Sequence, residues 1–293
     1  DLHLATWNVR TLYQAGKLEN VKQEMKRPKI NILGMSETRW SDSGLVNTDS
    51  MKFIYSGGDK HERGVGVIFD QNIAKCLEGY WPISDRVLLV KINSAFFTIN
   101  IIQVYAPTAD ANEETIDHFY DDLDQAKSQC KASEVLIVMG DMNARVGEQR
   151  MNNTVGPHGL GTINERGERW AEWCTSNDQV IMNTWFQMPK RRKYTWIHPS
   201  GKSRSQIDYI TINNRFRNAV KKTQTYPGAD CGSDHILLAA KVNIKPKKPI
   251  QKSITKRLDY ERLMKDTDLK YKYSNELQRR YQSIESENDA KTK

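Results

Sequence analysis

The sequence predicts an α/β domain in which two mixed β-sheets pack face to face, with helices on the outside. Segments rich in Val, Ile, Thr and Tyr recur through residues 1–244 and have the composition of β-strands. Several of these segments follow one another with only a short turn between them, as in 87–105 and 194–212. A purely parallel sheet needs a helical crossover after each strand, so this pattern favours mixed sheets.

The predicted elements are distributed along the whole domain. Strands are expected at 3–9, 30–35, 64–69, 87–92, 96–105, 135–139, 180–183, 194–197, 207–212 and 235–242. Helices are expected at residues 17–27, 113–131 and 164–177. The second helix opens with Glu113 and Glu114, whose charges suit a helix N-terminus. With 293 residues and 38% hydrophobic content, the chain is long enough to bury a sizeable core.

A change in composition at residue 245 predicts a domain boundary. Residues 245–249 read Lys-Pro-Lys-Lys-Pro, which is typical of a linker. We therefore expect one α/β domain at 1–244 and a basic linker with a partly helical tail at 245–293. The tail has an apolar stripe at helical spacing: Tyr273, Leu277, Tyr281 and Ile284. It holds 14 Lys and Arg against 8 Asp and Glu, an excess that adds phosphate affinity or forms a solvated face.

Cysteine spacing and hydropathy argue against a disulfide-rich, zinc-binding or membrane protein. The four cysteines are far apart and show no C-x-x-C spacing, so neither a zinc site nor a disulfide framework is expected. No apolar run approaches the roughly 20 residues of a membrane span. The chain runs at once into strand-like sequence, so no signal peptide is expected either. We expect a protein of a reducing compartment that has no membrane partner.

Polar residues recur where the predicted strands begin or end. They are Asn8, Glu37, Tyr105, Asp141, Asn143, Asp208, Asp234 and His235. Loops at strand ends are where α/β proteins place their active sites, although a single carboxylate there is more often a turn or cap residue. Asp208 lies inside a predicted strand, where an unpaired charge is costly. Together these residues suit Mg²⁺-assisted phosphodiester hydrolysis, because hard cations take oxygen ligands and phosphate needs donors.

Seven short segments occur in an order that is similar to a known family. They are Thr6-Trp7-Asn8-Val9, Ser36-Glu37-Thr38, Val104-Tyr105-Ala106-Pro107, Gly140-Asp141-Met142-Asn143, Tyr194-Thr195-Trp196, Ile207-Asp208-Tyr209-Ile210 and Ser233-Asp234-His235. This set resembles the motifs of the endonuclease/exonuclease/phosphatase superfamily over residues 3–244. The amino-acid sequence at 7–11 and 140–144 is most similar to that of endonuclease domains of RTE-type non-LTR retrotransposons. The resemblance implies the DNase I-like fold, a four-layer sandwich of two packed mixed β-sheets flanked by helices.

The resemblance also implies metal ligands. Glu37 matches the principal metal ligand of the family, with Asn8 beside it and Asp234 as a further acidic group near the metal. The expected cofactor is Mg²⁺, with Mn²⁺ as a substitute. One departure concerns Arg10, which stands where abasic-site endonucleases of this fold carry a second acidic ligand. One main metal site is therefore expected.

Catalytic roles follow from the same resemblance. Asp141 matches the residue that orients or deprotonates the attacking water, and Asn143 matches a donor to the scissile phosphate. His235 matches the histidine that contacts phosphate, and Asp208 the carboxylate that orients it. Tyr105 matches a hydroxyl on the phosphate side.

Basic residues near one predicted strand suggest a DNA contact. The expected DNA-binding residues are Arg39, Lys190, Arg191, Arg192, Lys193, Trp196, Lys202 and Arg204. Most lie in 189–204, where a basic hairpin could enter a groove and hold phosphates, or could be only a solvated charged turn. Ser205 follows this segment where abasic-site enzymes carry a Trp, which argues against efficient abasic-site repair.

The leading hypothesis is a retrotransposon-derived, nuclear endonuclease that nicks double-stranded DNA and leaves a 3′-hydroxyl. A second hypothesis keeps the fold but makes inositol phosphates or sphingolipids the substrate, since one fold supports both. The basic hairpin favours DNA. A third is a domesticated protein that binds chromatin or partner proteins without catalysis. The intact Glu37, Asp141, Asn143, Asp208 and His235 argue against lost activity.

Overall fold

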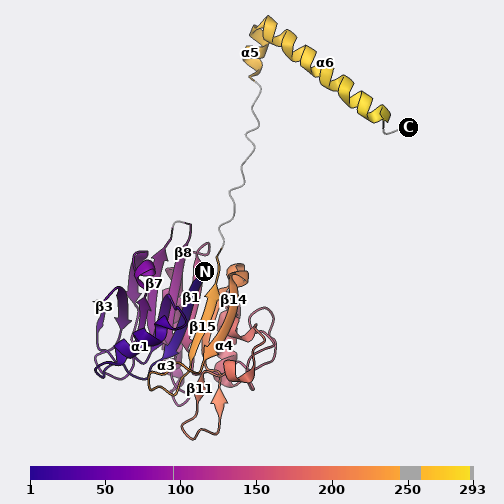
Figure 1. Cartoon of the computed structure of the whole chain (residues 1–293). Helices are drawn as coiled ribbons and strands as arrows, with labels where there is room; N and C mark the ends of the chain where they lie inside the picture. The colour runs from indigo at the N-terminus through magenta and orange to yellow at the C-terminus, as the bar shows by residue number, and fades with distance from the viewer. Residues whose placement is uncertain (95, 245–258, 291–293) are drawn as a thin grey trace. The chain divides into compact units, whose positions relative to one another are not determined.

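The computed structural model of the chain describes residues 1–94, 96–244 and 259–290, and the side chains of residues 285–290 are not described (Figure 1). The chain separates into two compact units, Asp1–Pro246 and Lys247–Lys293. The predicted boundary and basic linker at residue 245 lie outside the described residues.

Two mixed sheets form the first unit. One has the order β14-β15-β1-β2-β5-β4-β3, and the other has the order β10-β13-β9-β8-β7-β6. The first sheet holds β1 (Leu2–Asn8), β2 (Ile32–Ser36), β3 (Ser43–Thr48), β4 (Met51–Ser56), β5 (Val65–Phe69), β14 (Val220–Tyr226) and β15 (Leu237–Val242). The second holds β6 (Leu77–Pro82), β7 (Val87–Asn93), β8 (Thr98–Tyr105), β9 (Val135–Asp141), β10 (Gln179–Ile181) and β13 (Asp208–Asn213). Each contains one parallel pair, β1 with β2 and β8 with β9, as mixed sheets require.

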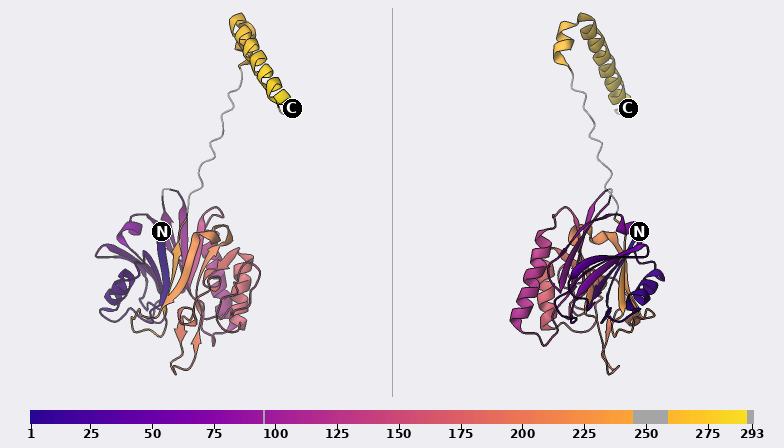
Figure 2. Two further views of the ribbon diagram at one scale, coloured as in Figure 1. Left: turned by 45° about the vertical axis from the view of Figure 1, so that its right-hand side comes forward. Right: turned by 90° about the vertical axis from the view of Figure 1, so that its left-hand side faces the viewer.

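Helices cover the outer faces of both sheets. These helices are α1 (Lys17–Lys26), α3 (Glu113–Ser128) and α4 (Glu165–Ser176), whereas the short α2 (Gln71–Ala74) contributes Ala74 to the core between the sheets. Side chains of α1 such as Val21 share a core with Phe53 of the first sheet. Side chains of α3 and α4, including Phe119 and Trp170, pack with Val138 of the second sheet. The right-hand view of Figure 2 shows α1 on one side and α3 and α4 on the other, with the sheets between them. The predicted four-layer sandwich is confirmed.

The central core lies between the two sheets. Leu4, Ile32 and Val67 of the first sheet pack against Leu88 and Ile137 of the second. Because helices bury the opposite faces as well, the central strands are apolar on both sides. This explains why β2, β5 and β9 are buried along their whole length and read as continuous apolar runs.

A small polar cluster between the sheets fixes the end of β2. The Gln103 amide donates to Ser36 Oγ at 3.1 Å, and Ser36 Oγ donates to the Val104 carbonyl at 2.8 Å. Gly34 makes room for this cluster, because a Cβ there would lie 1.8 Å from Gln103 Oε1. Ser36 is therefore held against the second sheet, directly before Glu37.

Several predicted elements differ from the structure. Strands β3, β4, β6 and β14 were not predicted. The predicted strand 180–183 is wrong at its end, because a 3₁₀ turn, η1, occupies Met182–Thr184. The predicted strand 194–197 is reduced to β11 (Trp196–Ile197), which pairs with β12 (Arg204–Ser205). Helix α3 ends at Ser128, three residues earlier than predicted.

The second unit contains two helices, α5 (Tyr260–Lys265) and α6 (Thr267–Ala290). Helix α6 covers the predicted apolar stripe, and Tyr273, Leu277, Tyr281 and Ile284 are all exposed. No helix among the described residues is both long and apolar enough to cross a membrane.

Candidate active site

Strand ends from both sheets meet at one end of the sandwich. Asn8 ends β1 and lies in register with Ser36, the last residue of the parallel strand β2. In the second sheet, Tyr105 and Asp141 end the parallel strands β8 and β9 in register with each other. Asp208 begins the antiparallel strand β13 opposite Asp141. The topology thus collects residues that are far apart in sequence.

The side-chain amide of Asn8 joins the two sheets. Its Nδ2 donates to Glu37 Oε1 and to Asp141 Oδ2, both at 2.9 Å. Its Oδ1 accepts a hydrogen bond from the backbone N–H of Arg10 at 2.9 Å, which fixes the orientation of the amide. The amide therefore holds one carboxylate from each sheet in contact with a single donor group.

His235 lies between two buried aspartates. Its Nδ1 is 3.0 Å from Asp208 Oδ2, and its Nε2 is 3.7 Å from Asp141 Oδ2. The Thr195 hydroxyl accepts the backbone N–H of Asp208 at 3.0 Å, and the His235 carbonyl accepts the Trp7 indole N–H at 2.9 Å. These two bonds fix the backbones of Asp208 and His235. The imidazole is thus oriented by Asp208 with its other nitrogen toward Asp141.

Burial and neighbouring charges shift the pKa values of this pair. Burial lowers the pKa of His235, but the carboxylates of Asp208 and Asp141 outweigh it and raise the pKa to about 9. Burial raises the pKa of Asp141 to about 7, and the nearby Asp208 carboxylate adds to the effect. The protonated imidazole is therefore favoured at neutral pH, and Asp141 is poised to exchange a proton there.

Asn143 and Tyr105 complete the cluster. The backbone N–H of Asn143 donates to Asp141 Oδ1 at 2.9 Å, and its side-chain amide donates to the Ala106 carbonyl at 2.9 Å. Asn143 has φ of 47°, a left-handed conformation that asparagine tolerates better than most residues. Burial, followed by the Glu37 carboxylate, raises the pKa of Tyr105 well above its usual value. Tyr105 therefore keeps its proton and remains a donor.

Comparisons with known proteins show the family to which the chain belongs. A model of the Endonuclease/Exonuclease/phosphatase family matches residues 5–235. The chain belongs to this family. It is 44% identical over 245 residues to craniofacial development protein 2 of Bos taurus, an alignment that covers 83% of this chain and 41% of that protein. The chain thus spans about two fifths of the length of this relative.

Solved structures of the family share the fold at low sequence identity. The catalytic domain of Xenopus laevis APE2 matches with a TM-score of 0.65 and 16% identity, over 84% of this chain and 93% of that one. The endonuclease domain of TRAS1, a telomere-specific non-LTR retrotransposon, matches with a TM-score of 0.61 and 12% identity, over 83% and 100% of the chains. The predicted membership of the endonuclease/exonuclease/phosphatase superfamily is confirmed.

Nucleases and phosphatases of this family depend on a divalent metal, and the donors around Glu37 fit such an ion. Glu37 Oε1 accepts from Asn8 and Oε2 accepts from Arg39 Nη2 at 3.2 Å, which leaves lone pairs on both oxygens. Asp208 Oδ1 is buried and has no hydrogen-bond partner among the described residues, as expected of an oxygen kept for a cation or substrate. Glu37 thus offers carboxylate oxygens, which Mg²⁺ prefers, and Asn8 Oδ1 keeps a lone pair beside the hydrogen bond that it accepts from Arg10.

The described contacts of Asp234 leave its predicted role as a metal ligand untested. Asp234 Oδ2 accepts from the Trp196 indole at 2.9 Å, and its described contacts do not join it to Glu37 or Asn8. Asp141, Asp208 and His235 instead present ligand atoms within 4.8 Å of one another. The predicted ligand set of Glu37, Asn8 and Asp234 remains a prediction, and this second cluster is a possibility that the sequence did not suggest.

Arg86 is a neighbour of the site that was not predicted. Its guanidinium donates to the Tyr105 carbonyl at 3.1 Å and lies 5.2 Å from the centre of the Tyr105 ring. Arg86 precedes β7, so it stands before the beginning of a strand, whereas most of the predicted site residues stand at strand ends. The antiparallel pairing of Val87 with Val104 brings it to the site. A prediction of the register between β7 and β8 would have placed Arg86 next to Tyr105.

The basic segment near the site combines exposed and internally bonded cations. Lys190, Arg191, Lys202 and Arg204 are exposed. Arg192 donates to the Thr225 carbonyl at 3.0 Å and Lys193 to the Gly159 carbonyl at 3.3 Å, so both also serve the fold. Trp196 forms a β-bridge with His235, which attaches the β11–β12 hairpin directly to the site. Figure 1 shows this hairpin projecting from the end of the domain that lies away from the N-terminus.

Proposed function

We propose that this chain is a Mg²⁺-dependent endonuclease that nicks double-stranded DNA and leaves a 3′-hydroxyl, and that it derives from a retrotransposon. The observation that carries the proposal is the arrangement around Asp141, which touches the Asn8–Glu37 pair on one side and faces the His235–Asp208 pair on the other. Hydrolysis needs a group that accepts a proton from the attacking water next to positively charged donors that stabilise the phosphate.

Each residue then has a task in the hydrolysis. Glu37, with Asn8 and Asp234, would hold the metal, which neutralises phosphate charge when bound. Asp141 accepts a proton from the attacking water, and its pKa near 7 suits that task. The oxygen of this water forms a bond to phosphorus while the bond from phosphorus to the 3′-oxygen breaks, and the leaving 3′-oxyanion takes a proton from solvent water.

The remaining groups stabilise the phosphate. The protonated His235 supplies positive charge and a donor, and Asp208 keeps its ring in place. The Asn143 amide and the Tyr105 hydroxyl are further donors. The products are a 5′-phosphate and a 3′-hydroxyl, the end that can prime synthesis.

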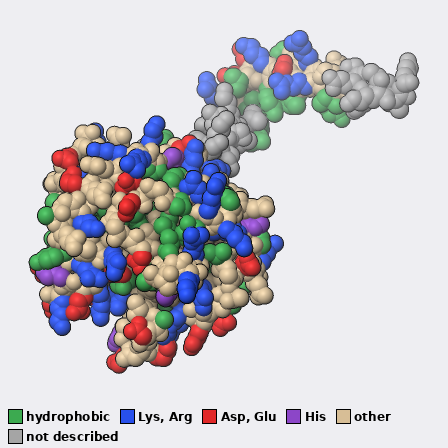
Figure 3. Space-filling view, turned by 60° about the horizontal axis from the view of Figure 1, so that its bottom comes forward, with side chains coloured by type: hydrophobic (Ala, Val, Ile, Leu, Met, Phe, Trp, Pro, Cys, Tyr) green, Lys and Arg blue, Asp and Glu red, His purple; other side chains and the backbone are tan. Residues whose placement is uncertain are grey.

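Duplex DNA is the substrate that the surface favours, and we propose a nuclear or nucleocytoplasmic location for the protein. Figure 3, which brings the end with the hairpin forward, shows Lys and Arg side chains across this end of the domain. Inositol phosphates or sphingolipids would not need cations spread over such a surface. The exposed Lys202 and Arg204 on the projecting hairpin therefore support DNA.

The test is conversion of supercoiled plasmid to open circles with Mg²⁺ and then Mn²⁺, with EDTA as the negative control. Asp141→Asn should abolish nicking, whereas Asp121→Asn, an equal change at an exposed position of α3, should leave it unchanged. A polymerase should extend the nick without prior phosphatase treatment. If the folded protein fails to nick in either metal, the binding-protein hypothesis replaces this one.

We also propose that undamaged DNA is cleaved as well as abasic DNA. Arg10 and Ser205 stand where abasic-site enzymes carry Asp and Trp, and the Arg10 side chain is exposed. The measurement is the cleavage rate of one duplex with and without a single abasic site. A strong preference for the abasic duplex would contradict the inference from these two positions.

A further inference from the structure

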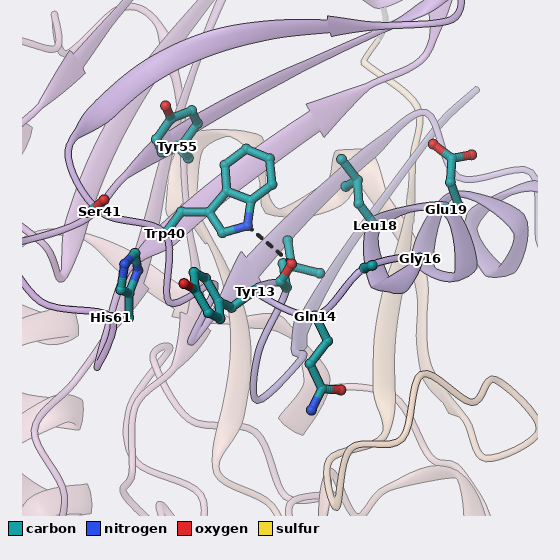
Figure 4. Close-up of a pocket in the computed structure, with 11 residues that line it drawn as sticks. Tyr13, Gln14, Gly16, Leu18, Glu19, Trp40, Ser41, Tyr55 and His61 are labelled. Carbon is teal, nitrogen blue, oxygen red and sulfur yellow. Dashed lines mark hydrogen bonds between the residues drawn. The ribbon is translucent and has the colours of Figure 1, made fainter.

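A pocket of about 490 Å³ is lined by none of the residues assigned to the hydrolysis above (Figure 4). The loop after β1 and the start of α1 form one side of it, and the loops after β2 and β4 form the other. Its aromatic residues are Tyr13, Trp40, Tyr55 and His61. Polar groups of Gln14, Ser41 and Glu19 also line it.

Hydrogen bonds connect this pocket to the two residues that follow Glu37. The Leu12 N–H donates to the Thr38 carbonyl at 2.9 Å, and His61 Nδ1 lies 2.9 Å from the Arg39 carbonyl. The Trp40 indole N–H donates to the Leu12 carbonyl at 3.2 Å, the bond drawn in Figure 4. The pocket is therefore built on the backbone that also positions the proposed metal ligand.

The rings of the pocket are fixed at its base and open at its rim. Trp40 makes edge-to-face contacts with Phe53 and Tyr55 at centroid distances of 5.1 and 4.9 Å. At the rim, the Tyr13 ring is 65% exposed and lies 4.4 Å from the His61 ring. Exposed ring faces above a fixed aromatic base suit a further planar ring.

We propose that this pocket binds one unpaired nucleobase of the DNA, next to the phosphate that is cut; the proposal rests on the proposed function. A base has apolar faces that can stack on Tyr13 and a polar edge that the Gln14 amide can bind as both donor and acceptor. The pocket volume lies within the range of about 300–1,000 Å³ for small-ligand sites. Arg10 and Lys60 are exposed on the loops that form it and can hold the flanking phosphates.

This pocket would give the enzyme a preference for nucleotides that leave the duplex easily. Unstacking costs least where a base is mismatched or unpaired, so such positions fill the pocket most readily. Cleavage would then concentrate beside such bases, without a direct reading of paired sequence. An abasic nucleotide has no base to fill the pocket, so the abasic strand gains no such preference.

The test measures binding in EDTA, where no cleavage occurs. A labelled duplex with one extrahelical nucleotide is compared with the same duplex without it, for the wild type and Tyr13→Ala. The wild type should bind the extrahelical duplex more tightly, and Tyr13→Ala should weaken that binding by about 5- to 150-fold while the paired duplex is unaffected. A 2-aminopurine at the extrahelical position should be quenched by the wild type only.

Two controls separate stacking from general effects. Tyr13→Phe keeps the ring and should behave as the wild type, and Phe96→Ala removes an equally exposed ring far along the sequence and should change nothing. Equal wild-type affinity for both duplexes, or an equal weakening on both in Tyr13→Ala, overturns the proposal. A failure of plasmid nicking would refute the catalytic proposal alone, since this readout needs no cleavage.

Discussion

Asp141 is the residue at which the two sides of the site meet. Its Oδ2 accepts from the Asn8 amide and faces His235, and its Oδ1 accepts the backbone N–H of Asn143. The sequence predicted Asp141, Asn8 and His235 as site residues because strand ends are where such residues act. It could not predict that one amide would contact two carboxylates, because that contact depends on how the sheets align.

The roles of Glu37 and His235 should separate in kinetics. His235→Asn removes a charged donor and should lower the nicking rate by about 10²- to 10⁴-fold, with the Mg²⁺ concentration for half-maximal rate unchanged. Glu37→Gln removes a ligand charge and should raise that Mg²⁺ concentration. Plasmid nicking over a Mg²⁺ titration measures both quantities. A near-normal rate for His235→Asn would remove this residue from the mechanism.

The raised pKa of His235 should make stability depend on pH. The folded pKa of about 9 lies above the ordinary value of about 6.5, so the folded state binds the extra proton between these values. The stabilisation is complete below pH 6.5 and is lost as the pH rises through 9, by up to about 3 kcal/mol. Urea unfolding in EDTA between pH 6.5 and 9 measures it. His235→Gln should flatten this dependence, and an unchanged slope would assign it to another group.

At the scale of elements, the proposed role of the β11–β12 hairpin in DNA binding can be tested directly. Lys202→Ala with Arg204→Ala should weaken DNA binding and reduce the slope of log affinity against log salt by roughly 0.9 for each phosphate that the variant no longer neutralises. Lys75→Ala removes an exposed cation outside the hairpin and serves as the control. Anisotropy titrations over a range of salt provide the measurement. An unchanged slope in the double variant would show that the hairpin is only a solvated turn.

The strands that are buried along their whole length are among those that the sequence predicted. Strands β2, β5 and β9 are covered on both faces, so their apolar runs are unbroken. The missed strands β3 and β14 lie at the two edges of the first sheet, where one side of the strand needs no partner. Lys221 and Lys222 of β14 are exposed, and their charges hide the strand pattern. These edge strands form because they pair with a neighbouring strand of the sheet, and local composition does not reveal that pairing.

At the scale of the whole molecule, the second unit should be separable from catalysis. Every residue assigned to the chemistry lies at or before His235, and the described apolar stripe of α6 is exposed. A chain ending at Ile244 should fold, cleave at the same rate with saturating DNA, and bind DNA more weakly at low salt with a shallower salt dependence. If the stripe instead docks on the first unit, the truncation will lower the melting temperature and leave the salt slope unchanged.

The distribution of the two sheets along the chain has a consequence for the timing of activity. The first sheet is built from β1–β5 near the N-terminus and from β14 and β15 near residue 242, and the whole second sheet lies between them in sequence. A nascent polypeptide on the ribosome therefore carries Asn8, Glu37 and Asp141 long before His235 is synthesised. Since β15 pairs directly with β1, the centre closes only when the last strand emerges. An unfinished chain therefore lacks the complete set of residues that the proposed chemistry needs.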